Sequence, residues 1–254
     1  MMKLSLLLCV VNKRHNSDEL MTKSKGVIRE APRDSYRYLA PFYESLARWV
    51  FGQELIKAHR DLFSAEDLLS SPIEKVERIY WLGGGTGITL CELVESAPKA
   101  EIFYIEPSKA MLTKAQRRAS LLSAEDRSRI IWVHETHRWL YTDQNVQRSK
   151  NSLLITLFFM DVLGEEDCIE LIEWSIKFGV THWFFADFTP QEKLIARLFI
   201  QLMYVCFAVS TGIKQHSILP HQELLSRFGW KSISGSERRR ARGLVYSAHL
   251  TRDS

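Results

Sequence analysis

The chain has 254 residues, of which 46% are hydrophobic and 25% are charged, so it can bury one substantial core. Its formal net charge of +4 is too small an excess to indicate a nucleic-acid-binding protein. The 4 cysteines are widely spread and form no C-x-x-C pair, which excludes a disulfide framework or a zinc knuckle as the expected role and favours reduced thiols.

Residues 1–34 are predicted to form a flexible N-terminal segment, because residues 12–33 are polar and charged and have no clear hydrophobic period. The short apolar run before them is not followed by a small-residue cleavage site, so we expect a cytoplasmic protein. From Ser35 onward the apolar spacing predicts an amphipathic helix, and a second helix is expected over 53–63. Residues 35–254 are expected to form one domain, in which 35–64 and 190–228 contribute a helical lid.

Strands and helices alternate from residue 79 onward. Apolar runs predict five strands separated by helices, which is the order of an α/β fold with a parallel sheet; the strands are 79–82, 101–105, 130–133, 153–158 and 182–186, and the helices are 88–97, 108–122 and 165–178. Two further helices, 191–209 and 220–228, precede strands at 230–233 and 244–250. These last strands are expected to form an antiparallel hairpin, completing a seven-stranded, mostly parallel sheet with an antiparallel terminal strand.

The arginine cluster 238–242 lies between the two final strands. It is interpreted as the solvated tip of their hairpin. The alternative is attraction to an acidic substrate or peripheral contact with a membrane surface.

A glycine-rich loop directly follows the first predicted strand. Gly83, Gly85 and Gly87 allow the backbone to approach a ligand at positions where side chains would block it, although a tight turn without a ligand gives the same pattern. Glu106 ends the second strand, where a carboxylate can accept both hydroxyls of a ribose; the alternative is a solvent-facing acid. Together these features indicate a cofactor that contains adenosine.

The glycine spacing distinguishes between two such cofactors. The dinucleotide fingerprint G-x-G-x-x-G requires a glycine at position 88 or 90, where Ile88 and Leu90 stand. S-adenosylmethionine has no pyrophosphate and does not need that glycine, so it is favoured. A nicotinamide-dependent oxidoreductase remains a weaker alternative.

Two segments carry a resemblance to a known family. The segment 79–87, followed by 105–115, resembles class I S-adenosylmethionine-dependent methyltransferases, especially the branch of the ubiquinone and menaquinone C-methyltransferases. In that branch the second segment has the pattern acid-x-Ser-x-x-Met-Leu-x-x-Ala, which residues 106–115 match. The opening Tyr-x-x-x-Ala-x-x-Tyr of the branch is similar to residues 36–43. The resemblance covers about residues 36–188 and implies a Rossmann-like fold.

The resemblance also implies roles for individual residues. The glycine loop would line the methionine moiety, Glu106 would hold the ribose, and residues 111 and 136 would lie beside the adenine. Two positions where the family often carries an acid are Trp81 and Thr136 here. The implied cofactor-binding residues are Gly83, Gly84, Gly85, Thr86, Gly87, Glu106, Pro107, Ser108, Met111, Thr136 and Phe158, and the implied substrate-lining residues are Tyr36, Tyr43, Phe159 and Asp187.

The expected reaction is methyl transfer from S-adenosylmethionine to a small acceptor, which the apolar run 198–209 and the aromatic residues of 36–49 suggest to be lipophilic or aromatic. Asp161, after the fourth strand, is the candidate base, and Asp187 is the reserve. The alternative role of Asp161 is to cap the helix that starts near Gly164.

No metal is expected, because the histidines of 134–137 are three apart at a strand end and not four apart on a helix. No nucleic-acid partner is expected either. The departures at Trp81 and Thr136 also keep open a catalytically silent protein that retains the fold as a binding or scaffold module.

Overall fold

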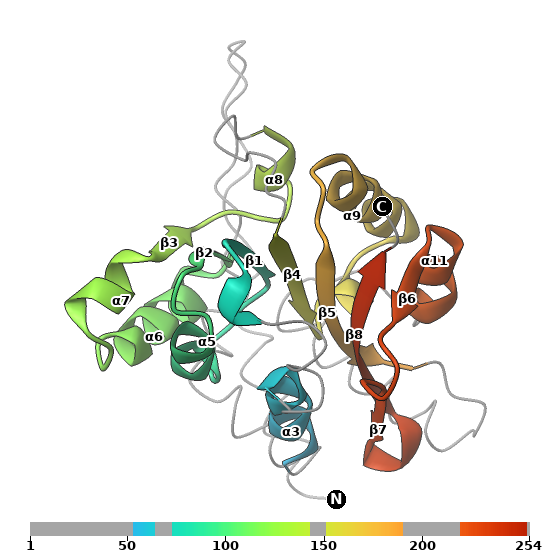
Figure 1. Cartoon of the computed structure of the whole chain (residues 1–254), viewed down its shortest axis with the longest axis horizontal. Helices are drawn as coiled ribbons and strands as arrows, with labels where there is room; N and C mark the ends of the chain where they lie inside the picture. The colour runs from blue at the N-terminus through green and yellow to red at the C-terminus, as the bar shows by residue number, and fades with distance from the viewer. Residues whose placement is uncertain (1–52, 64–72, 143–150, 190–218, 253–254) are drawn as a thin grey trace, which may run out of the picture. The chain divides into compact units, whose positions relative to one another are not determined.

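A computed structural model of the protein describes residues 53–63, 73–142, 151–189 and 219–252 (Figure 1). All of them belong to the compact unit Pro32–Ser254, and the unit Met1–Ala31 lies outside the described residues. Tyr36, Tyr43, the first predicted helix and the predicted helix 191–209 also lie outside them, so the lid prediction is untested over most of its length. Within the described ranges, no helix is long and apolar enough to cross a membrane.

Five parallel strands form the centre of the sheet in the order β3-β2-β1-β4-β5. Their bounds are β1 Arg78–Leu82, β2 Glu101–Ile105, β3 Ile130–Val133, β4 Ser152–Leu157 and β5 His182–Phe188. The strand order reverses at β1, because β2 lies on one side of it and β4 on the other. In open α/β sheets, ligands bind beyond the carboxyl ends of the strands at such a switch point.

Antiparallel strands extend the sheet beyond β5. β8 (Val245–Arg252) pairs with β5 along one edge, and along its other edge it pairs with β6 (Trp230–Ser232) and β7 (Arg238–Arg240). The α/β fold class and the antiparallel terminal strand are therefore confirmed. Over the described residues the sheet has 8 strands, however, and not the seven predicted from the sequence.

The additional strand is β7, which consists of three consecutive arginines. The interpretation of 238–242 as a hairpin tip is wrong for Arg238–Arg240, because these three residues pair with β8. The chain turns only after them, at Ala241–Gly243 (η4). An arginine can lie on an edge strand because its long stem packs along the sheet while its guanidinium remains near water.

Helices cover both faces of the sheet, because the side chains of each central strand alternate between two apolar clusters. Ile79 and Trp81 of β1 join the cluster formed with α5 (Leu90–Ser96) and α6 (Lys109–Ala119). Tyr80 and Leu82 join the opposite cluster, together with α8 (Trp139–Thr142), α9 (Glu165–Lys177) and α11 (His221–Arg227). A short helix, α7 (Ala124–Ser128), precedes β3.

The helix α3 (Glu54–Arg60) lies near the carboxyl end of β5, where its Ala58 packs with Phe188 and Val245. The 3-10 turn η1 (Asp61–Phe63) follows it directly. The buried Asp61 carboxylate accepts hydrogen bonds from Arg240 Nε at 2.8 Å and from Ser247 Oγ at 2.7 Å. This tie fixes α3 and η1 to β7 and β8. Two more 3-10 turns, η2 (Ile73–Lys75) and η3 (Met160–Val162), precede β1 and follow β4.

Candidate functional site

The glycine loop leaves β1 at the switch point of the sheet. Gly83, Gly85 and Gly87 have φ angles of 61°, 60° and 68°, in the left-handed region that side chains other than glycine rarely adopt. The loop is anchored to the neighbouring strand, because Gly83 N–H donates to the Ile105 carbonyl at 2.9 Å. The sequence pattern therefore corresponds to a real backbone requirement and is not incidental.

The glycines are needed on two different sides of the loop. A Cβ at Gly84 would lie 2.3 Å from the buried ring of Tyr104, and a Cβ at Gly83 would lie 2.5 Å from the ring of Phe159. Among the described residues, a Cβ at Gly85 would instead meet nothing closer than 3.9 Å. Gly83 and Gly84 thus rest against the protein, whereas Gly85 faces a side that is open within the described part of the chain.

Glu106 joins the loop to the start of α6. Its buried carboxylate accepts the Gly85 N–H through Oε2 and the Ser108 N–H through Oε1, each at 2.8 Å. Glu106, the residue predicted to hold the ribose, therefore ties the glycine loop and the start of α6 into one unit.

Other predicted cofactor-binding residues surround this unit. Ser108 is the N-cap of α6, and its Oγ accepts the Met111 N–H at 3.2 Å. Thr86 and Met111 are buried, Pro107 is half-buried, and the half-buried Thr136 follows β3. Because β1, β2 and β3 are parallel neighbours, the segments that follow them all begin at the carboxyl end of the sheet, which brings these residues to the same end.

Trp81 lies in the core and not at the site. Its side chain has 0% exposure and packs edge-on against Tyr104, with ring centroids 5.4 Å apart. Tyr104 in turn donates its hydroxyl to the Gly85 carbonyl at 3.1 Å. At the position where the family that the sequence resembles often carries an acid, this chain therefore has a buried residue that packs under the glycine loop through Tyr104.

Phe158 and Phe159 follow β4 and point in different directions. Phe158 has a φ of 53°, unusual for a residue with a side chain, and its ring lies 5.1 Å from Phe188 and 5.8 Å from His59 of α3. Phe159 packs against Gly83, and its ring lies 5.9 Å from that of His137. Phe159 is thus the one beside the glycine loop, and Phe158 is turned toward α3.

Sequence reasoning did not single out His59 as a site residue. Burial lowers the pKa of His59 to about 4, so its imidazole is neutral near pH 7. Its position could not be found from the sequence, because it depends on how α3 packs against the end of β4.

Two predicted acids meet at the carboxyl ends of β4 and β5: Asp161 follows β4, and Asp187 is the next-to-last residue of β5. Asp187 is 1% exposed and Asp161 is 5% exposed. The Asp187 carboxylate accepts the Asp161 N–H at 3.0 Å and the Phe188 N–H at 2.8 Å. Burial, and next the carboxyl of Asp161, raise the pKa of Asp187 well above its usual value. The N-cap residue of α9 is Gly164, which has no side chain to cap the helix.

His221 of α11 completes this buried cluster and was also missed from the sequence. It is 3% exposed, and its Nδ1 lies 3.9 Å from Oδ2 of Asp187. Among the described residues, neither ring nitrogen has a hydrogen-bond partner. Burial lowers the pKa of His221 to about 4, and the backbone of Met160 opposes that shift.

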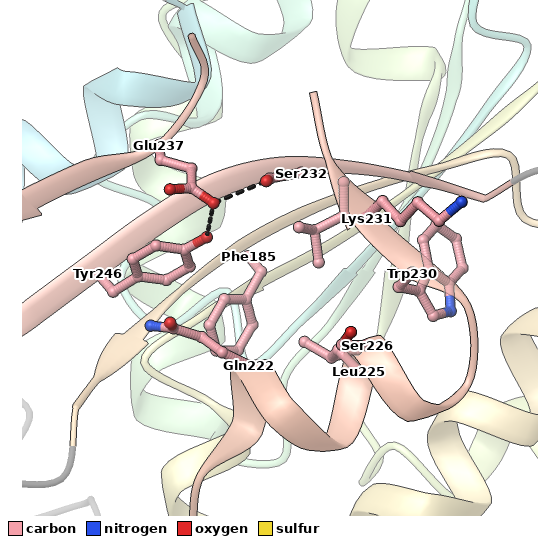
Figure 2. Close-up of a pocket in the computed structure, with 10 residues that line it drawn as sticks. Phe185, Gln222, Leu225, Ser226, Trp230, Lys231, Ser232, Glu237 and Tyr246 are labelled. Atoms are coloured by element: carbon pink, nitrogen blue, oxygen red, sulfur yellow. Dashed lines mark hydrogen bonds between the residues drawn. The ribbon is translucent and has the colours of Figure 1, made fainter. Parts of the chain in front are cut away.

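A separate hollow of about 280 Å³ lies away from the glycine loop, between α11 and the strands β5, β6 and β8 (Figure 2). Its rim includes Glu237, whose carboxylate accepts hydrogen bonds from Ser232 Oγ at 2.7 Å and from the Tyr246 hydroxyl at 3.0 Å. None of the predicted site residues lines it. In the described part of the chain, no group of three or more His, Cys, Asp or Glu side chains is placed to hold a metal ion.

Comparison with solved structures identifies the fold. The structure of the mitomycin 7-O-methyltransferase MmcR matches with a TM-score of 0.55 and 14% identity, over 86% of this chain and 59% of that one. A candidate methyltransferase from Thermobifida fusca YX matches with a TM-score of 0.64 and 11% identity, over 89% of this chain and 97% of that one. The chain has the Rossmann-like methyltransferase fold.

A third structure with this methyltransferase fold, the S-adenosylmethionine-dependent methyltransferase SibL in its apo form, matches with a TM-score of 0.51 and 15% identity. The match covers 84% of this chain and 58% of SibL, so the chain spans less than two thirds of both SibL and MmcR. No protein-family model matches the sequence, and no curated protein matches it.

Proposed function

We propose that this chain binds S-adenosylmethionine and transfers its methyl group to a small acceptor. The observation that carries the proposal is the unit formed by Gly85 and Glu106 at the switch point of a sheet with the methyltransferase fold. The open side of Gly85 gives the donor's methionine moiety room to approach the backbone, and Glu106 supplies acceptors for the ribose hydroxyls. The remaining implied contacts, from Thr86 to Thr136, are part of the same proposal.

The two phenylalanines after β4 divide the site. Phe159 lies against the glycine loop, so we assign it to the donor side, and Phe158 is assigned to the acceptor side together with Phe188. This exchanges the roles that the family resemblance implies for residues 158 and 159. An acceptor site bordered by these aromatic rings favours a lipophilic or aromatic acceptor. The narrower assignment to the quinone-biosynthesis branch rests on the sequence resemblance alone.

Asp161 remains our candidate for accepting a proton from the acceptor, with Asp187 holding it in place. Methyl transfer needs the acceptor atom aligned with the sulfonium methyl and shielded from water, so alignment and exclusion of water are the protein's main tasks. A base is required only when the acceptor atom carries a proton that it must lose.

Isothermal titration tests the proposal directly. We expect S-adenosylmethionine and S-adenosylhomocysteine to bind to the wild type and NAD not to bind. Binding of NAD alone would favour the oxidoreductase alternative, and binding of none of the three would refute the proposed cofactor.

The alternative of a silent binding protein stays open at Trp81. The fully buried Trp81 side chain cannot touch the donor's amino group, which an acid at this position is expected to hold. Incubation of the protein with labelled S-adenosylmethionine and a panel of phenols, quinols and polar hydroxy compounds separates the two functions. Transfer of label supports the enzyme, whereas binding without transfer to any compound supports the silent module.

A further inference from the structure

The helix α3 crosses the carboxyl end of the sheet beside the switch point. Its Ala58 packs against the end of β5. The ring of the next residue, His59, is stacked on that of Phe158, directly after β4, with the ring centroids 5.8 Å apart. Arg60 then donates to Glu92 of α5, the helix that follows the glycine loop, at 3.3 Å. His59 is therefore placed between the end of β5 and the helix after β1, where open α/β sheets bind their ligands.

Aromatic and aliphatic side chains lie beside His59 at this place. The Phe158 ring is 5.1 Å from that of Phe188, and Leu55 of α3 packs against the same cluster. The Phe158 N–H donates to the Ala186 carbonyl at 2.7 Å, which holds the backbone at a φ of 53° that a residue with a side chain seldom adopts. Backbone outliers held in this way are typical of functional sites. His59 thus adds a polar group to an apolar wall at the end of β4.

The imidazole of His59 has an unsatisfied polar atom. Its Nδ1 is shielded from water, and among the described residues it has no hydrogen-bond partner. A polar group that loses water without gaining a partner is destabilising, and native structures keep few of them. A neutral imidazole offers one donor and one acceptor, so it can pair with a hydroxyl or an amine of a bound molecule.

The charged residues that flank His59 in α3 and η1 are paired elsewhere. Arg60 is paired with α5, Asp61 with β7, and Lys57 with Glu54. Burial lowers the pKa of His59 to about 4, and no charged group of the described residues contributes to that shift. The ring is therefore neutral near pH 7, and its described surroundings favour an uncharged ligand over a carboxylate or a phosphate.

From this arrangement we infer that His59 hydrogen-bonds the methyl acceptor and orients its nucleophilic atom, so that the acceptor is an uncharged aromatic or apolar compound carrying a hydroxyl or an amine. The inference rests on the proposed function and deepens it by naming the acceptor class. The acceptor's O–H or N–H donates to the ring, which leaves a lone pair of the same atom to face the sulfonium methyl. A neutral ring holds that atom without placing a second positive charge beside the sulfonium. Asp161 stays the candidate base.

The test compares two probes of the same shape. In p-xylene a methyl group replaces the hydroxyl of p-cresol, and p-toluate carries a carboxylate at the same position. Each probe is titrated into the wild-type chain saturated with S-adenosylhomocysteine, which fills the donor site and cannot react. The readout is the ratio of the Kd of p-xylene to the Kd of p-cresol, because the difference in hydrophobicity between the probes is the same for every variant.

Two substitutions remove the ring nitrogens. His59→Phe keeps a ring against Phe158, and we expect it to lower the Kd ratio about three- to tenfold, which is the effect of one lost hydrogen bond. His59→Leu is measured in parallel, so the result does not depend on one variant folding. Lys57→Gln, at an exposed position of the same helix, is the matched control and should keep the ratio of the wild type.

A second readout reports on the imidazole itself. The side-chain nitrogen resonances of His59 are assigned by their loss in His59→Phe. We expect them to shift when p-cresol binds and to shift clearly less with p-xylene, because only the phenol forms a hydrogen bond to the ring. A purely structural role of His59 would give equal shifts with both probes.

Four results would overturn the inference: no binding of p-cresol to the complex with S-adenosylhomocysteine, tighter binding of p-toluate than of p-cresol, an unchanged Kd ratio in the His59 variants, or an equal change in Lys57→Gln. Failure of S-adenosylhomocysteine itself to bind to the wild type would instead refute the proposed function. Far-ultraviolet circular dichroism confirms that each variant is folded before it is titrated.

Discussion

Glu106→Gln is the most informative single substitution, because the carboxylate organises the loop and is also the proposed ribose ligand. Its two oxygens accept N–H groups from Gly85 and Ser108. A glutamine keeps one acceptor oxygen and turns its NH₂ group toward the other backbone N–H, so one buried donor loses its partner. Loss of one charge-assisted hydrogen bond and the resulting unpaired N–H cost about 3 kcal/mol of unfolding free energy.

Thermal unfolding and cofactor titration measure the two effects separately. A loss of about 3 kcal/mol lowers Tm by about 6 to 12 °C for a domain of this size. Because the proposed ribose contacts also weaken, S-adenosylmethionine affinity should fall by at least about tenfold. Glu101→Gln is the matched control at the opposite end of β2, where the acid makes only a partly exposed ion pair with Arg78 at 3.6 Å and its loss costs under about 1 kcal/mol. A Glu106→Gln protein with the Tm and affinity of the wild type would refute the reasoning.

Other substitutions test the loop, the tie to α3 and the buried histidines. Gly84→Ala should unfold more easily than Gly85→Ala, because the new Cβ at position 84 would lie 2.3 Å from the Tyr104 ring. At Gly85 the loss of unfolding free energy comes from the positive φ alone and is about 1 to 2 kcal/mol. The reverse order of stability in chemical denaturation would contradict the loop geometry. Asp61→Asn should lower the unfolding free energy by about 3 kcal/mol because it leaves Arg240 without its buried anion, and equal urea midpoints for variant and wild type would exclude that tie. Burial lowers the pKa of His249 from 6.5 to about 4, so the folded state favours the neutral ring, and the stability this gives is complete above pH 6.5 and is lost as pH falls toward 4. The urea midpoint of His249→Gln should therefore fall less than that of the wild type over this range, and parallel curves would show that His249 does not contribute.

The central strands could be predicted from the sequence because each is a short apolar run bounded by residues that end strands. The predicted bounds of β2 and β3 are confirmed, and the loop after β1 was marked by three glycines whose positive φ angles the structure contains. Local pattern is sufficient here, since both faces of these strands are covered and tolerate only apolar side chains.

β7 could not be predicted in this way, because three consecutive arginines carry no strand signal. Its position depends on pairing with β8 and on the contact of Arg240 with Asp61, which is 179 residues away in sequence. The same limit explains His221: nothing next to it in the sequence distinguishes it from a surface histidine at the start of a helix. Only packing against β5 brings it to Asp187.

The directions of Phe158 and Phe159 illustrate a third limit. Alternation along a strand predicts which face each side chain meets, but it fails where the backbone leaves the strand conformation. The alternation of side chains between the two faces is broken at Phe158, whose φ is 53°. The sequence could therefore place both rings at the end of β4 but could not assign one to each side of the site.

The pairing of β8 has a consequence for how the chain folds during synthesis. On the edge that faces away from β4, the seven residues of β5 from His182 to Phe188 pair with Thr251 to Val245. Until those residues leave the ribosome, β5 has an open hydrogen-bonding edge flanked by buried aromatic side chains, and such an edge is a template for association with other chains. Substitutions that slow the docking of β8 should therefore reduce the yield of soluble protein more than they reduce the stability of the finished fold.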